Sequence, residues 1–193
     1  MKTRCQWCKN TFDMYVKYHD QEWGVPVHDD RTHFEFLVLE SAQAGLSWAT
    51  ILKKREGYRN AFANFEVSKV AEFDQSMVAE LLQNAAIIRN QKKIEATINN
   101  AQKFIKVQRE FGSFDKYIWE FVGGKPIINH WEIMDEVPVT TKESDALSKD
   151  LKKKGFKFVG STTIYAHMQA IGMVMDHTVD CFRYHELKND PSY

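Results

Sequence analysis

One stretch of the sequence carries the strongest signal for the fold: Phe34-Glu35-Phe36-Leu37-Val38-Leu39-Glu40, followed after two residues by Gln43-Ala44-Gly45-Leu46-Ser47-Trp48. The first part is typical of a buried helix, and Glu40 is an acid at the end of this apolar run. A carboxylate that leaves water in such a helix needs a partner or a ligand to offset its lost hydration. Glu40 is therefore the first candidate functional residue.

Helices are expected along nearly the whole chain, so we predict an all-α fold. Asp29 and Asp30 can cap a helix over residues 31–44, which Gly45 ends, and Ser47 can cap the next helix. A sheet is not expected, because alternating β-branched runs are scarce. The further helices are predicted over residues 48–56 (ending near Gly57), 58–62, 67–73, 77–84 (capped by Ser76), 114–122 and 161–174.

Two other helices have recognisable ends. Apolar residues recur at helical steps from Ile94 to Ile105, and Gly112 ends this helix. Thr140 and Glu143 are spaced as a capping box for a helix that ends at Gly155. A linker over residues 125–139 precedes the second of these helices.

Five residues near the two ends of the chain can ligate a metal ion. Cys5 and Cys8 form a C-x2-C pair, His19 follows, and His177 and Cys181 are four residues apart. Zinc takes four such ligands, and spacing alone allows either Cys8 or His19 as the fourth. Four protein ligands leave no open position, so such a site would be structural. The simpler alternative is that these are separate core thiols and surface imidazoles.

The bulk composition is that of an ordinary globular protein. The 193 residues suit one domain, 1–193, of two helical lobes, in which zinc would join residues 1–25 to residues 165–185. Lys and Arg number 26, as do Asp and Glu, so nucleic-acid binding would depend on local patches. We expect no membrane span, no signal peptide, a cytoplasmic location and a monomer.

A short apolar turn over residues 82–94 joins two predicted helices and carries Arg89, Lys92 and Lys93. A helix-hairpin-helix of this kind presents backbone amides and a helix N-terminus to a DNA phosphate. The usual glycines of the turn are replaced by Ala85 and Ala86. The alternative is that these charges belong to a solvated helix face.

Aromatic residues are unusually dense around Glu40 in the sequence. An acid beside aromatic rings can receive a flat ligand that is cationic or carries an amine. Core packing is the alternative for each ring alone. The residues concerned are Trp7, Tyr15, Tyr18, Trp23 and Trp48.

Taken together, several long motifs closely resemble the bacterial 3-methyladenine DNA glycosylase I family, over about residues 4–184. They are Arg4-Cys5-x-Trp7, Tyr18-His19-Asp20-x-Glu22-Trp23-Gly24-Val25-Pro26, Gln43-Ala44-Gly45-Leu46-Ser47-Trp48, Leu52-Lys53-Lys54-Arg55-Glu56, Asp145-Ala146-Leu147-Ser148, Lys154-Gly155-Phe156-Lys157-Phe158-Val159-Gly160 and Asp176-His177. The resemblance implies a helix-hairpin-helix DNA glycosylase fold with a structural zinc ion. Its implied zinc ligands are Cys5, His19, His177 and Cys181.

The resemblance also assigns roles around the lesion. Gly45 and Leu46 would lie at the damaged nucleotide, with Leu46 as the wedge, and Arg89, Lys92 and Lys93 would contact DNA. Most of the superfamily has a catalytic aspartate after the hairpin, which this family lacks. Base recognition would fall to Glu40, Tyr18, Trp48 and Trp7, with Tyr15 and Trp23 nearby.

The implied function is base excision repair of double-stranded alkylated DNA. Methylation at N3 makes adenine cationic and weakens its glycosidic bond, so we expect a monofunctional hydrolase that releases free 3-methyladenine without strand cleavage. Glu40 is the candidate catalytic residue. The alternatives are a non-catalytic DNA-lesion-binding module and a zinc-stapled protein that binds a small purine. Whether 3-methylguanine is also removed is left open.

Overall fold

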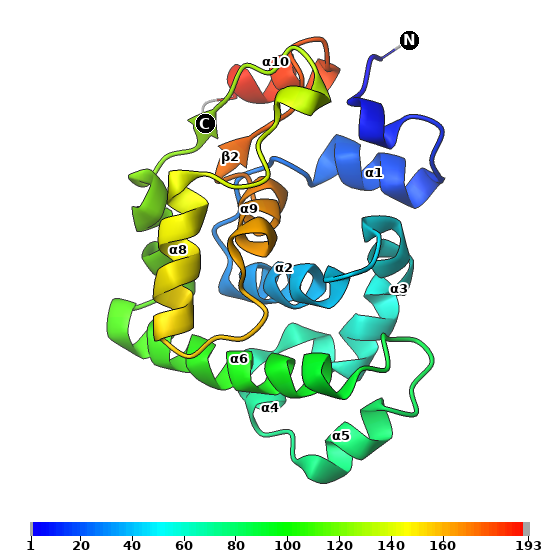
Figure 1. Cartoon of the computed structure of the whole chain (residues 1–193), viewed down its shortest axis with the longest axis vertical. Helices are drawn as coiled ribbons and strands as arrows, with labels where there is room; N and C mark the ends of the chain where they lie inside the picture. Colours follow the sequence, from blue (N-terminus) through cyan, green and yellow to red (C-terminus); the bar gives the residue numbers. More distant parts are fainter. Residues whose placement is uncertain (1, 191–193) are drawn as a thin grey trace.

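The computed structural model describes residues 2–190, and its architecture is predominantly helical (Figure 1). Residues 1 and 191–193, and with them the ends of the predicted 1–193 domain, lie outside this description. No helix of the described part is long and apolar enough to cross a membrane. The α-helices are α1 (Asp13–Gln21), α2 (Asp30–Gln43), α3 (Trp48–Ala61), α4 (Val67–Ala71), α5 (Gln75–Leu81), α6 (Gln91–Phe111), α7 (Phe114–Trp119), α8 (Lys142–Lys153), α9 (Ser161–Ala170) and α10 (Phe182–Lys188).

Short elements complete the chain. The 3-10 helices are η1 (Gln6–Cys8), η2 (Ala63–Phe65), η3 (Glu120–Val122) and η4 (Met134–Glu136). Strands β1 (Ile127–Ile128) and β2 (Val174–Met175) pair in parallel, with Ile127 opposite Val174. The expectation of no sheet is therefore wrong in this one place, where two-residue strands tie the 125–139 linker to the segment after α9.

Helix α2 is the centre of the fold, as its apolar sequence predicts. Every residue from His33 to Ala42 is buried. A helix that is apolar nearly all round must be covered on all sides, and α3, α6, α7 and α9 pack against it. Glu35, a buried acid of this helix, is neutralised by Arg55, whose Nε lies 2.7 Å from the carboxylate, and by Arg59.

Gly57 does not end a helix, contrary to the prediction. Helix α3 runs through it to Ala61, because the glycine serves packing rather than termination. A Cβ at this position would lie 2.3 Å from the carbonyl oxygen of Ala86 in the α5–α6 connection. The missing side chain lets that connection pack directly onto α3. The sequence gives no sign of this contact beyond the glycine itself.

Other helix ends also differ from the predicted ones. The capping box of α8 uses Thr141 and Ser144 instead of Thr140 and Glu143, one residue further along. Asp74, not Ser76, caps α5, and α9 stops at Ala170. The long helix α6 is confirmed, with Gly112 as its C-terminal cap. Helices α1 and α10 were not delimited from the sequence, because each is too short for a clear period.

Candidate active site and metal cluster

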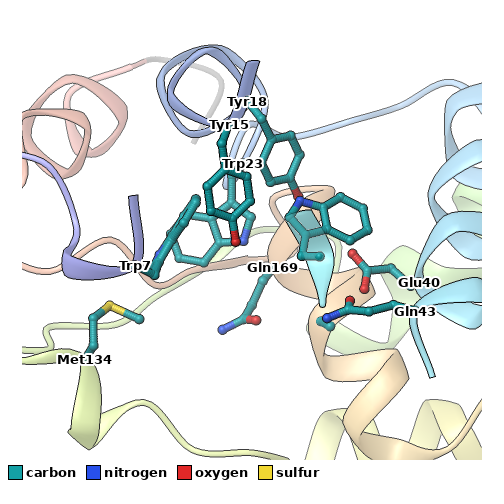
Figure 2. A pocket seen from close by; sticks show the side chains of 10 residues that line it. Trp7, Tyr15, Tyr18, Trp23, Glu40, Gln43, Met134 and Gln169 are labelled. Atoms are coloured by element: carbon teal, nitrogen blue, oxygen red, sulfur yellow. The ribbon is translucent and has the colours of Figure 1, made fainter. Parts of the chain in front are cut away.

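The aromatic residues and the acid singled out in the sequence line a single pocket (Figure 2). The pocket has a volume of about 190 Å³. A cavity of roughly 150 Å³ holds a benzene ring, so this one suits a single flat heterocycle. Its walls include Trp7, Tyr15, Tyr18, Trp23, Glu40 and Trp48. All six predicted base-binding residues therefore meet at one place, although η1, α1, the turn after α1, α2 and α3 supply them.

Glu40 is the buried carboxylate of this pocket, and its side chain points inward (Figure 2). The residue is 5% exposed and forms no hydrogen bond or ion pair with any residue from 2 to 190. Burial raises the pKa of Glu40 to about 8. The contrast with the paired Glu35 on the same helix is clear. A buried acid without a protein partner is a candidate for holding a ligand.

The rings around Glu40 form two groups. Trp7 meets Tyr15 and Trp23 edge-on, with centroid separations of 5.3 and 5.1 Å. Tyr18 and Trp48 are 5.3 Å apart. Burial, with the Glu40 charge as a smaller cause, raises the pKa of Tyr18 well above its usual value, so its hydroxyl stays a neutral donor. The Trp48 Nε1 donor is buried and has no acceptor within the described chain.

Four further residues line the pocket and were not predicted as base-binding, although Gln43 stands in one of the quoted motifs: Gln43, Met134, Ala166 and Gln169. Gln169 Nε2 donates a 2.8 Å hydrogen bond to Asp176, whose carboxylate also accepts from Tyr165. This bond commits the amide nitrogen to Asp176. Gln169 lies on α9 and Asp176 in the segment after β2. In the sequence, only the Asp176-His177 motif pointed to this contact.

The turn that follows Glu40 projects an apolar side chain. Gly45 has a φ of 77°, a conformation that favours glycine, and the residue after it, Leu46, is 40% exposed. Ser47 then caps α3 through the backbone N–H of Thr50. The predicted wedge therefore stands on the surface, a few residues beyond the pocket acid.

The predicted DNA-binding cations, Arg89 before α6 and Lys92 and Lys93 in its first turn, separate into two kinds. Arg89 and Lys92 are exposed. Lys93 instead donates hydrogen bonds of 2.7 Å to the carbonyl oxygens of Ala42 and Ala44, and its partial burial lowers its pKa. Two of the three cations are thus available to a phosphate, whereas Lys93 fastens α6 to the C-terminal end of α2.

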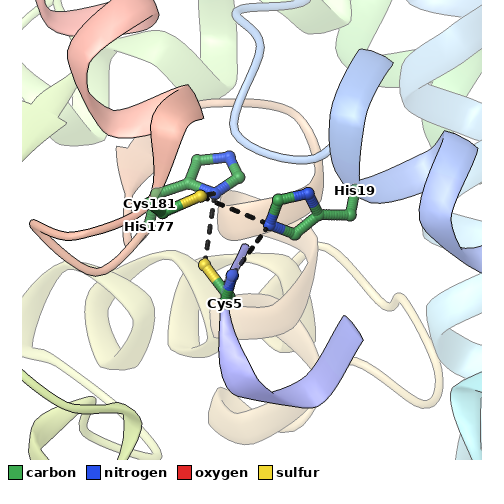
Figure 3. A group of neighbouring side chains, drawn as sticks. All are labelled: Cys5, His19, His177 and Cys181. Carbon is green, nitrogen blue, oxygen red and sulfur yellow. Dashed lines mark hydrogen bonds between the residues drawn. The ribbon is translucent and has the colours of Figure 1, made fainter. Parts of the chain in front are cut away.

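The metal-ligating residues also come together, in a second cluster (Figure 3). The ligand atoms of Cys5, His19, His177 and Cys181 all lie within 4.8 Å of one another. His177 Nδ1 is 3.4 Å from Cys5 Sγ and 3.5 Å from Cys181 Sγ. Zinc bonds of about 2.0–2.3 Å in a tetrahedron give ligand separations of about 3.6 Å. Cys8 is buried but does not belong to the cluster.

The surroundings of the cluster suit a cation. His19 Nδ1 hydrogen-bonds Asp20, and His177 Nε2 hydrogen-bonds the carbonyl of Trp23, which leaves His19 Nε2 and His177 Nδ1 facing the sulfurs. Such outer partners orient metal-ligating histidines. The adjacent Cys181 sulfur, together with burial, raises the pKa of Cys5. A cation held between the two sulfurs would favour the deprotonated form of both thiols.

Comparisons with known proteins identify the family of the chain. A family model described as methyladenine glycosylase matches residues 7–184. The chain belongs to the methyladenine glycosylase family. A curated member, DNA-3-methyladenine glycosylase 1 of Escherichia coli (strain K12), is 46% identical over 94% of this chain and 96% of its own length. The Haemophilus influenzae DNA-3-methyladenine glycosylase is 45% identical over 94% and 97%.

Solved structures of the methyladenine glycosylase family have the same fold. One of them, 3-methyladenine DNA glycosylase I from Staphylococcus aureus, is described as showing the structural basis of 3-methyladenine recognition by that protein. Its sequence is 39% identical to this chain. It superimposes with a TM-score of 0.90 over 93% of this chain and 95% of that one. The predicted family is therefore confirmed, and so is the predominantly helical fold.

Proposed function

We propose that this protein is a DNA-3-methyladenine glycosylase, which hydrolyses the N-glycosidic bond of 3-methyladenine in alkylated DNA. The observation that carries the proposal is the unpaired, buried Glu40 carboxylate in a pocket walled by aromatic rings. The relatives support it, because the curated ones are named for this activity. DNA repair by base excision is the corresponding biological role.

The substrate must leave the duplex before it can enter the pocket. Extruding a nucleotide costs a few kcal/mol, and a damaged, poorly stacked base costs less. In this proposal Leu46 occupies the space that the extruded base leaves. Helix α5, residues 82–90 and the start of α6 act as a helix-hairpin-helix, in which Arg89 and Lys92 contact phosphates. These contacts fix the position of the protein without reading the sequence.

Inside the pocket, charge and ring faces select the base. N3-methyladenine attached to the sugar is a cation, and stacking it on an aromatic face contributes roughly 1–2 kcal/mol. Trp48 and Trp7 are the proposed stacking partners, and Tyr18 supplies a second polar contact. Glu40 accepts a hydrogen bond from the exocyclic amine. Because Glu40 has no partner among residues 2–190, a bound cation supplies the charge that its ionised form needs.

Bond cleavage then needs little proton transfer from the protein. The electron pair of the C1′–N9 bond passes to the base, which leaves as neutral 3-methyladenine. The sugar acquires oxocarbenium character, and the Glu40 carboxylate stabilises this positive charge. Water adds at C1′ and loses a proton to solvent, which leaves an abasic site. No lysine lines the pocket in the described chain, in keeping with a monofunctional enzyme.

We further propose that Cys5, His19, His177 and Cys181 hold a structural zinc ion. Their separations and oriented imidazoles support this assignment. The ion would join η1 and α1 to the segment before α10, next to the Trp7 and Trp23 walls of the pocket. With four protein ligands it would hold the fold together and take no part in the chemistry.

Product analysis tests the proposed activity. Duplex DNA alkylated with a radiolabelled methyl group should release free 3-methyladenine above the spontaneous rate, and the strand should stay intact. A protein that binds this DNA without releasing base would instead be a lesion-binding module. A protein that binds free purine and shows no salt-dependent DNA affinity would be the small-ligand binder.

A further inference from the structure

Phe158, in the connection between α8 and α9, is an exposed aromatic residue in a strained backbone conformation. Its φ is 55°, in the left-handed region, and the residue is 36% exposed. A side chain with a Cβ is disfavoured there, and glycine is the usual occupant. The neighbouring Phe156 and Val159 are buried and anchor the loop, whereas Phe158 is left partly exposed. Strain of this kind is typically kept for a functional reason.

Three hydrogen bonds hold this conformation. The buried Asn100 side chain donates to the carbonyl of Lys157 and accepts from its N–H, both at 2.8 Å. Ser41 Oγ donates to the carbonyl of Phe158 at 3.3 Å. Ser41 directly follows Glu40 on α2. The backbone of the loop is thus fixed to α6 through Asn100 and to α2, the helix that carries the pocket acid, through Ser41.

The surface beside Phe158 is suited to a polyanion. Phe158 and the exposed Lys157 and Lys92 border a groove of about 380 Å³ along the first turns of α6. Glu95 is the acidic residue in its lining. Lys92 lies in the first turn of α6, which is part of the proposed helix-hairpin-helix, so this groove continues the surface to which the proposed function assigns DNA. Lys93, one position further, bonds the turn that carries Leu46.

We propose that Phe158 is a second apolar contact with DNA, stacking on a base that becomes exposed where the duplex opens around the extruded nucleotide. Lys92 and Lys157 flank it and neutralise phosphates. The inference rests on the proposed function, because it needs a duplex opened next to the Glu40 pocket. Leu46 and Phe158 would then contact the opened duplex from two sides of the α6 N-terminus. Base–aromatic stacking is tolerant of sequence, as a lesion-directed enzyme requires.

Phe158→Gly is the decisive variant, because glycine accepts the left-handed backbone and removes only the ring. Its Tm should equal or exceed that of the wild type. Its affinity for a duplex with a tetrahydrofuran abasic analogue should fall about 10-fold, the size expected for the loss of one stacking contact. Its affinity for free 3-methyladenine and for an undamaged duplex should not change. Phe158→Trp should restore binding, and Val139→Ala, at another exposed apolar position, serves as the matched control.

Three results would overturn the inference. The first is wild-type affinity of Phe158→Gly for the abasic-analogue duplex. The second is an equal loss on the undamaged duplex, which would place the ring on the backbone instead of a base. The third is a parallel loss of free 3-methyladenine binding, which would indicate a distorted pocket. If the wild type releases 3-methyladenine while Phe158→Gly binds normally, this inference alone fails and the proposed function stands.

Discussion

The ammonium group of Lys93 donates a 2.7 Å hydrogen bond to the carbonyl oxygen of Ala44, at the end of the helix that carries Glu40. A second bond of the same length reaches Ala42. Together they join the start of α6 to the turn that presents Leu46. A DNA-facing segment and the proposed base reader are therefore linked by one side chain, and their relative position depends on it.

Lys92 and Lys93 should respond differently to substitution, although they are adjacent. Lys92→Met removes an exposed cation and should reduce the slope of log affinity against log salt concentration by about 1. Lys93→Met should leave that slope unchanged but lower the Tm and the rate of excision. DNA binding measured over a series of salt concentrations separates the two. A reduced slope for Lys93→Met would show that Lys93 contacts a phosphate after all.

Glu40 should lower the stability of the free protein at neutral and alkaline pH. The unfolded chain ionises this acid near pH 4.3, whereas the folded protein retains the proton up to about pH 8. Between these values the folded state binds more protons, so the free energy of unfolding falls as pH rises. The gain in Tm of Glu40→Gln over the wild type should therefore be small at pH 4 and largest at about pH 8. At that pH the free energy of unfolding should differ by up to a few kcal/mol.

Thermal unfolding across this pH range measures the effect, and Glu35→Gln is its control. Glu35 lies on the same helix but is paired with Arg55 and Arg59, so its substitution should destabilise the protein at neutral pH. A gain for Glu40→Gln that did not grow with pH would contradict the proposed burial of an unpaired acid.

Excision should accelerate with rising pH and level off above about pH 8. The ionised form of Glu40 attracts a cationic base, and kcat/KM reports the ionisation of the free enzyme. The raised pKa of Tyr18 keeps its hydroxyl neutral over this range. The profile should be measured with the spontaneous release of base subtracted at each pH. A flat profile for the wild type would count against ionised Glu40 as the active form.

Loss of a ligand of the proposed zinc ion should destabilise the protein more than loss of a buried thiol outside the cluster. Cys181→Ser should abolish stoichiometric zinc and lower the Tm by about 10 °C, the size expected for a loss of several kcal/mol. Cys8→Ser changes a buried cysteine outside the cluster and should retain one zinc per chain. Zinc content and thermal unfolding measure both. Full zinc in Cys181→Ser, or its loss in Cys8→Ser, would require a different ligand set.

Much of the site could be predicted from the sequence, because its residues lie in recognisable patterns. Glu40 stands out in the sequence as an acid in an apolar helix, and the six predicted base-binding residues do meet at one pocket. The choice between Cys8 and His19 depended on the resemblance, since C-x2-C spacing is ambiguous. The structure brings His19 into the cluster.

What could not be predicted depends on contacts between distant segments. Gly57 is explained only by the approach of Ala86, and the engagement of Lys93 only by the position of the α2 carbonyls. The position of Gln169 at the pocket depends on its hydrogen bond to Asp176. The strain at Phe158 has no local sequence signature either. The predicted monomer and the division into two lobes stay predictions.

The most direct test of the central claim is the single-turnover rate of 3-methyladenine release by the wild type and by Glu40→Gln. The glutamine variant keeps the shape of the side chain and removes its charge. We predict normal DNA binding and a rate about 100-fold lower, the scale on which one electrostatic contact to a transition state acts. Release by Glu40→Gln at the wild-type rate would contradict the role assigned to this carboxylate.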